Sequence, residues 1–162
     1  MPTYSDTLIR DVLNRVRSIA IVGVSADPVR PSHIVAKYLS AKGYRIFAVN
    51  PGLAGKAIFG EQAVASLNEL AWRIDMVDVF RRPDQVPPIA DDAIRIGAKV
   101  LWLQLGIVNE EARQKAEAAG LTVIMDRCPK IEFGRLSGEN GWLGIASQIV
   151  SAKPPSILGP RR

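Results

Sequence analysis

Short apolar segments alternate along this chain with longer segments in which apolar and polar residues mix. The apolar segments each run for six or seven residues and are almost unbroken, which is typical of strands buried on both faces of a parallel sheet. The pattern predicts strands at residues 18–24, 44–50, 75–80, 99–104 and 121–126, with a further short strand at 57–59.

Between these segments, apolar residues recur every three or four positions, as in amphipathic helices. Pro31 suits the first position of a helix, Asn109 suits an N-cap, and Gly43, Gly97 and Gly120 suit the residue after a helix end. The pattern predicts helices at 5–17, 31–42, 84–96 and 110–119, one helical turn after Ser66 and, more weakly, a short helix at 142–150.

Strands that alternate with helices across short connections indicate an α/β protein with an open parallel sheet. Helices on both faces of that sheet would make a three-layer αβα domain. The length of 162 residues fits one domain.

Composition narrows the function. Lys and Arg number 21 against 16 acidic residues, a net charge of +5, which suits an anionic partner. The aromatic content of 6% and the scattered basic residues argue against nucleic acid, and we interpret Trp72, Trp102 and Trp142 as packing groups. One cysteine and one histidine exclude a disulfide framework and the common zinc sites. The sequence shows neither an 18-residue apolar run nor a signal-peptide core, so we expect no contact with a membrane and a cytoplasmic setting.

The carboxyl ends of the predicted strands are where a ligand should bind. Gly23 ends the first strand and permits a tight turn, and the helix from Pro31 would direct free N–H groups and its positive dipole end to the same place. Ser25, Ser32 and Arg30 add donors suited to phosphate. Surface exposure of Arg30 is the competing interpretation.

Further candidates follow the other strands. Arg81 and Arg82 would favour a phosphorylated ligand or simply face solvent, and Phe80 would cover an adenine or join the core. The chain has one histidine and one cysteine. His33 could bind phosphate or act chemically, but it has no partner base nearby in the sequence. Cys128 would be a pocket residue, an inert thiol, or a thiolate that the charge of Arg127 favours. No paired carboxylates, P-loop or G-x-G-x-x-G fingerprint is evident, and Asn50 stands where NAD enzymes carry an acidic residue.

Six blocks in order resemble the bacterial CoA-binding domain proteins, stand-alone relatives of the CoA-binding domain of the succinyl-CoA synthetase α-subunit. The blocks are residues 19–25, 30–32, 49–51, 77–81, 101–106 and 125–129. The resemblance implies a Rossmann-like fold over residues 1–136, an extension at 137–162 and coenzyme A or acyl-CoA as ligand. It implies no ligase activity, because the synthetases use a second domain with a phosphorylated histidine.

The resemblance also implies a role for each block. The diphosphate would lie against Gly23, Val24, Ser25, Arg30, Pro31, Ser32 and His33; the ribose phosphate would border Asn50 and Pro51; the nucleotide would lie beside Val79, Phe80 and Arg81; and Gln104, Leu105 and Gly106 would line the pantetheine side, with Cys128 near the pocket.

Two other functions stay open at this stage. An NAD(P)-dependent oxidoreductase would use Arg45 and Arg81 for a 2′-phosphate, although the missing glycines oppose it. A protein-interaction domain without a ligand is the third interpretation. The sequence leaves a homo-oligomer or an unknown protein partner open.

Overall fold

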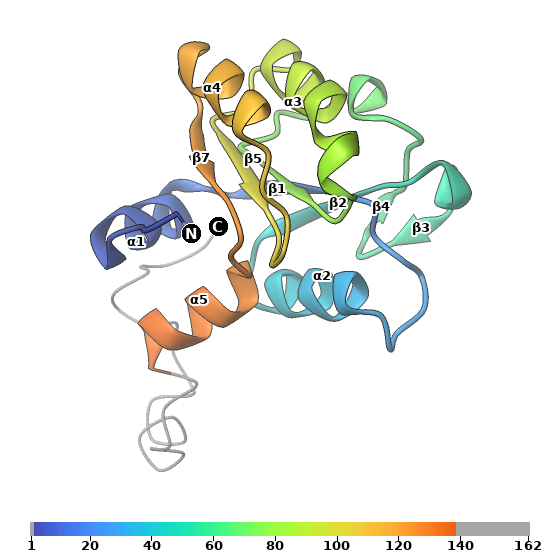
Figure 1. The fold of residues 1–162 in the computed structure, drawn as a ribbon. Coiled ribbons are helices and arrows are strands. Elements are labelled where there is room, and N and C mark those ends of the chain that lie inside the picture. The colour runs from blue at the N-terminus through green and yellow to red at the C-terminus, as the bar shows by residue number, and fades with distance from the viewer. Residues whose placement is uncertain (1, 139–162) are drawn as a thin grey trace.

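A computed structural model describes residues 2–138 of the chain. Five parallel strands form one sheet in the order β2-β1-β5-β6-β7 (Figure 1). The helices are α1 (Asp6–Arg15), α2 (Pro31–Ala41), α3 (Val86–Arg95), α4 (Glu110–Ala118) and α5 (Pro129–Ser137). The strands of the sheet are β1 (Ser18–Val22), β2 (Arg45–Val49), β5 (Met76–Val79), β6 (Val100–Leu103) and β7 (Thr122–Ile124). The smaller elements are the hairpin of β3 (Ala57–Ile58) and β4 (Glu61–Gln62) and the 3₁₀ turns η1 (Pro51–Leu53), η2 (Leu67–Glu69) and η3 (Pro83–Gln85).

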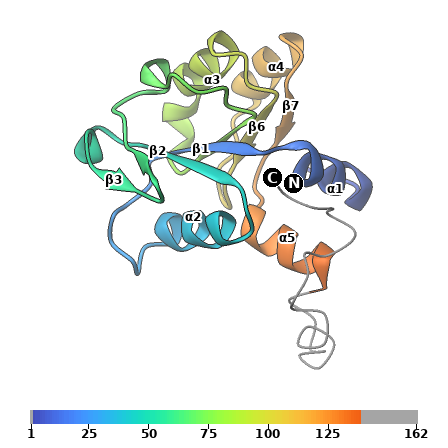
Figure 2. The same ribbon diagram turned by 180° about the vertical axis from the view of Figure 1, so that it is seen from behind.

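Two hydrophobic cores lie on opposite faces of the sheet. Side chains of α1, α2 and α5 pack on one face, and those of α3 and α4 pack on the other. Figure 1 and the reverse view in Figure 2 show the three layers. The predicted Rossmann-like αβα fold is therefore confirmed.

The predicted elements form, with ends that differ by a few residues. Asn109 caps α4 by accepting a hydrogen bond from the Ala112 amide at 2.9 Å, and Pro31 is the first residue of α2. The predicted strand at 121–126 is shorter, because the backbone leaves the sheet before Asp126, whose φ is +58°.

Three features were not predicted or not tested. Helix α5 was missed altogether, and the helix predicted at 142–150 lies outside the described residues. The proposed division between residues 136 and 137 stays a prediction; it falls in the last turn of α5. Among residues 2–138, no helix is both long and apolar enough to cross a bilayer.

Candidate functional site

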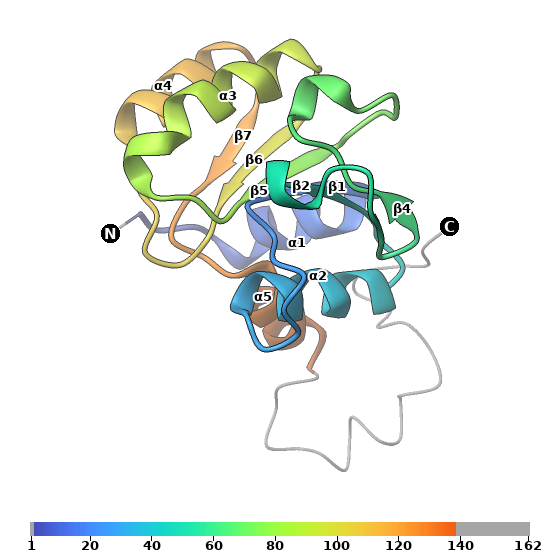
Figure 3. The same cartoon turned by 90° about the vertical axis from the view of Figure 1, so that its right-hand side faces the viewer.

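The strand order changes direction between β1 and β5. From β1 the chain passes through α2 on one face to β2, whereas β5 leads through α3 on the other face to β6. The carboxyl ends of β1 and β5 therefore diverge into opposite layers, and open α/β sheets bind ligands at such a point. Figure 3 shows the β1–α2 loop descending from the sheet to the start of α2.

Gly23 lies directly at this point and needs to be glycine. Its φ is +88°, and a Cβ there would stand 2.3 Å from the Phe80 carbonyl oxygen and 3.2 Å from Arg81 Nε. A β-carbon would thus collide with the backbone that leaves β5. The close contact also places the Arg81 side chain beside the turn that ends β1.

Side chains fix the loop that follows. The side-chain amide of Asn50 donates from Nδ2 to the Val24 carbonyl at 2.8 Å, and its Oδ1 accepts from the backbone amide of Gly52 at 2.9 Å. The buried Ser32 hydroxyl accepts from the Ser25 amide at 2.9 Å. Asn50 and Ser32 thus hold the loop in place through these hydrogen bonds. Any contact of theirs with a ligand would be additional to this structural role.

The start of α2 presents unused donors. The first amides of a helix have no partner within the helix, and the N-cap residue Arg30 supplies no side-chain bond to them. Arg30 and Pro31 are exposed. The amides of Ser32 and His33 are therefore free to bind an anion, and the exposed Arg30 comes directly before them in the chain.

His33 takes part in the structure of this loop. Its Nδ1 lies 2.9 Å from the Ser25 carbonyl oxygen, and its ring lies 5.0 Å from that of Phe59. Because a carbonyl only accepts, Nδ1 carries the proton and a neutral ring leaves Nε2 as an acceptor. His33 can therefore contact a ligand, but no acid or base is paired with it among residues 2–138.

Further candidate residues follow β6 and β7 at the same edge of the sheet. Gln104 is 7% exposed, and its Oε1 has no hydrogen-bond partner within the described chain. Asp126, which was not among the predicted site residues, accepts a bond from the Gly106 amide at 2.7 Å and so fixes that loop. Its left-handed backbone gave no signal in the sequence, although aspartate tolerates that conformation better than most residues. Leu105 is exposed at the tip.

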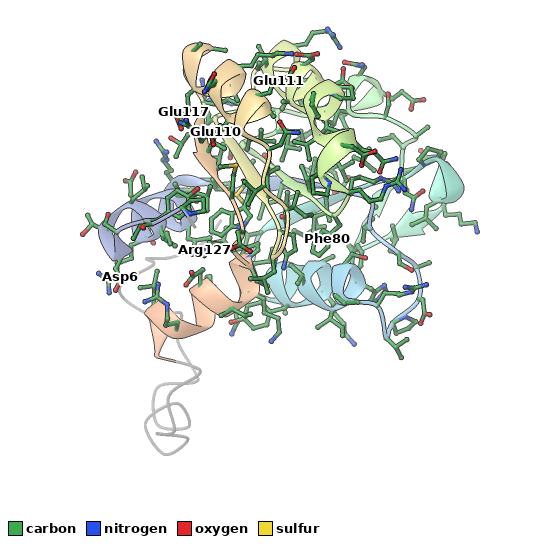
Figure 4. The ribbon with its side chains drawn as sticks, in the orientation of Figure 1. Asp6, Phe80, Glu110, Glu111, Glu117 and Arg127 are labelled. Carbon is green, nitrogen blue, oxygen red and sulfur yellow. The ribbon has the colours of Figure 1, made fainter. Side chains whose placement is uncertain are left out.

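The side chains of the remaining predicted residues either pack in the core or face solvent. The side chains of Val24 and Val79 are fully buried, so only their backbones could face a ligand, whereas Pro51 is exposed on η1. Phe80 packs against the core on the α2 side, as Figure 4 shows. Arg82 faces solvent 3.4 Å from Asp84.

One further expectation fails on geometry, and for Cys128 the structure favours one of the three alternatives, the inert thiol. Arg45 begins β2 at the opposite edge of the sheet, so it cannot share a phosphate with Arg81. The Arg127 guanidinium bonds the carbonyls of Asp126 and Pro2, while the buried Cys128 packs in the core as the N-cap of α5. Cys128 is thus a buried thiol, not an exposed nucleophile.

Titratable groups in this region do not form a recognisable reaction centre. Among residues 2–138, no three His, Cys, Asp or Glu side chains gather as for a metal ion. Burial raises the pKa of Asp78 well above its usual value, but this side chain lies inside the sheet beside Ile21 and Trp102 of the neighbouring strands. The raised pKa of Asp78 is therefore a result of burial in the apolar core.

The fold is that of an α/β protein of the nucleotide-binding type, with the start of α2 close to the switch point of its sheet. A family model described as a CoA binding domain matches residues 17–134. The chain belongs to this family, which supports a CoA-related binding role.

Several proteins share sequence and fold with most of this chain. The uncharacterized protein YneT of Bacillus subtilis is 44% identical over 131 residues, which are 81% of this chain and 96% of the relative. A solved Thermus thermophilus protein, cell-free ID.343, is 38% identical with a TM-score of 0.78, and covers 82% of this chain and 99% of its own. A hypothetical protein from Pyrococcus horikoshii OT3 has the same identity, TM-score and coverage of this chain, and 92% of its own chain is covered.

A larger enzyme shares the fold alone. The dinucleotide-forming acetyl-coenzyme A synthetase 1 of Ca. Korarchaeum cryptofilum is 21% identical with a TM-score of 0.56. The match covers 74% of this chain and 27% of the synthetase.

Proposed function

We propose that this chain is a cytoplasmic module that binds coenzyme A or an acyl-CoA at the carboxyl edge of β1 and β5, without catalytic machinery of its own. The observation that carries the proposal is the contact of Gly23 with the Phe80 carbonyl and Arg81, next to the start of α2. This arrangement gathers main-chain amides and guanidinium groups where a diphosphate would lie.

The remaining groups fit the rest of the ligand by their chemistry. Arg30 and Arg81 suit phosphate oxygens because a guanidinium offers a planar fork of donors. The orphaned Oε1 of Gln104 can accept a hydrogen bond, and the pantetheine arm carries amide N–H groups. A buried acceptor without a partner costs free energy, so a ligand donor there would be favourable.

The reactive side chains support a binding role over an enzymatic one. His33 Nδ1 is bound to the Ser25 carbonyl, and Cys128 packs in the core. Any reaction of the bound thiol would then depend on groups other than these two side chains.

Calorimetry with coenzyme A on the full chain tests the proposal. Hydrogen bonds to charged groups contribute about 1.5–3 kcal/mol each, so Arg81→Ala should weaken binding about 10- to 150-fold. Arg82→Ala is the matched control: it removes the same charge one residue further along, from a side chain that faces solvent near Asp84, and should leave the affinity unchanged.

NADPH fluorescence and the same calorimetry together separate the two alternative functions. NADPH fluorescence that rises on binding and is reversed by NADP but not by coenzyme A would favour the oxidoreductase. Absence of binding heat at millimolar coenzyme A, with the protein folded, would favour a ligand-free interaction domain and reject our proposal.

A further inference from the structure

A basic pocket lies at the edge of the sheet opposite the proposed coenzyme A site. It has a volume of about 500 Å³ and opens to solvent at the amino ends of β1, β2 and β5. Seven residues line it: Arg15, Arg17, Ser18, Arg45, Trp72, Arg73 and Asp75. The proposed function uses none of them.

The floor of this amino-edge pocket is held rigidly. The Ser18 hydroxyl donates to the Arg73 carbonyl at 2.6 Å and accepts from the Asp75 amide at 2.9 Å. The Asp75 carboxylate accepts from the amides of Arg17 and Ser18 at 2.8 and 3.3 Å. The one acidic group of the pocket is therefore occupied by backbone donors, which reduces its repulsion of an anion.

The four arginines are only partly neutralised. Arg45 bonds Glu61 at 2.8 Å, and Arg15 lies 3.6 Å from Asp11 and donates to the Thr122 hydroxyl. Arg17 forms no ion pair with any residue of the described chain, and the side chain of Arg73 is 80% exposed and 3.9 Å from Asp75. Three of the four arginines thus have a carboxylate within 4.0 Å, and Arg17 leaves the group with a net positive charge that a multivalent anion would offset.

Trp72 forms one wall of the pocket. Contrary to its interpretation as a packing group, it is 51% exposed, and the Arg45 guanidinium lies 3.7 Å from its ring centroid. The stacking holds Arg45 in a fixed plane beside the pocket. The indole also provides a spectroscopic probe: Trp102 is fully buried in the sheet, and a Trp72→Phe variant separates the signal of Trp72 from those of Trp102 and Trp142.

We propose that this pocket is a second anion site, which binds a small ligand carrying two or more phosphate groups. Guanidinium groups match phosphate oxygens two at a time, and four of them around one pocket suit a polyphosphate better than a single phosphate. The rigid floor means that little ordering would accompany binding.

Titration of the full chain with pyrophosphate and with ATP tests the proposal. We expect both to bind, to change the tryptophan fluorescence and to bind more weakly as salt rises. Trp72→Phe should abolish the fluorescence change and keep the binding heat. Arg17→Ala combined with Arg73→Ala should weaken binding at this site at least about 10-fold, since two charge-assisted contacts would be lost.

The controls separate this site from the carboxyl edge. Lys37→Ala with Arg82→Ala removes the same total charge elsewhere and should leave the fluorescence titration unchanged. Arg81→Ala should weaken the binding of coenzyme A but not the fluorescence response of Trp72, so either proposal can fail without the other.

Two outcomes would overturn the site. Equal losses of affinity in both double variants would show that only net charge matters. Binding as tight as that of the wild type in the Arg17/Arg73 double variant would show that the pocket does not bind the anion. Because both replaced side chains face solvent, thermal melting should confirm that the variants fold. Arg73→Glu, at a side chain that is 80% exposed, provides a second, charge-reversing test.

Discussion

Asp78 is a carboxyl group that the fold stabilises in its neutral form. It is fully buried, and neither oxygen makes a hydrogen bond within the described chain; the Val79 amide opposes the rise in its pKa only in part. Since the folded pKa exceeds the unfolded value of about 3.9, the folded state keeps a proton that the unfolded state loses. Stability contributed by this group is present below about pH 4 and is lost as pH rises toward the folded pKa.

Replacing Asp78 by valine should therefore stabilise the protein. We expect Asp78→Val to raise the free energy of unfolding at pH 7 by about 1–3 kcal/mol, because it removes a buried polar group without a partner. Urea denaturation between pH 4 and pH 7 should show the advantage growing with pH. An advantage that stays constant over this range would show that Asp78 does not titrate as argued.

Gly23 is the second residue whose role can be measured alone. Gly23→Ala should cost clearly more free energy of unfolding than Gly97→Ala, and should also weaken coenzyme A. Both positions have positive φ, 88° and 78°, but a Cβ at Gly97 meets nothing within 4 Å. The control should cost about 1–2 kcal/mol for the backbone conformation alone. Equal costs in denaturant titrations would contradict the close contact with Phe80.

At the scale of elements, one side chain joins α4 to the loop before α3. Asn109 caps α4 through Oδ1 and donates from Nδ2 to the Pro83 carbonyl at 2.9 Å. Asn109→Ala should cost about 1 kcal/mol or more in unfolding free energy, since both bonds are lost. Asn109→Ser keeps a cap and loses only the link to Pro83, so it should cost less in the same denaturation assay. A serine variant as unstable as the alanine variant would show that the cap contributes little.

Helix α5 shows why a pattern of apolar residues can miss an element. Besides Gly134, its buried residues are spaced as on one face of an ordinary helix, at Pro129, Glu132, Phe133 and Leu136. Two of these four are a proline and a charged residue, so no apolar stripe appears in the sequence. Glu132 is tolerated there because Arg135 bonds it at 2.8 Å and Arg127 lies 3.6 Å away. The pair with Arg135 is local to the helix, whereas the contact with Arg127 comes from outside it.

For the whole molecule, the sequence predicted the layers and the edge where the residues after β1 and β5 gather. That inference works because parallel strands end at one shared edge, so short motifs far apart in the chain meet there. The orphaned Gln104 oxygen and the exact neighbour of Gly23 could not be predicted, because they depend on side-chain packing. The amino-edge pocket was missed because its arginines lie between residues 15 and 73 and look like scattered surface charge.

The shortness of β1 has an electrostatic consequence. Its five residues separate the two edges by about 16 Å, which is roughly twice the distance over which physiological salt screens a charge. Two unit charges that far apart interact by only about 0.3 kcal/mol in water before any screening. Occupation of one edge would thus hardly affect the other in the cell, while in dilute buffer the two anions would begin to exclude each other.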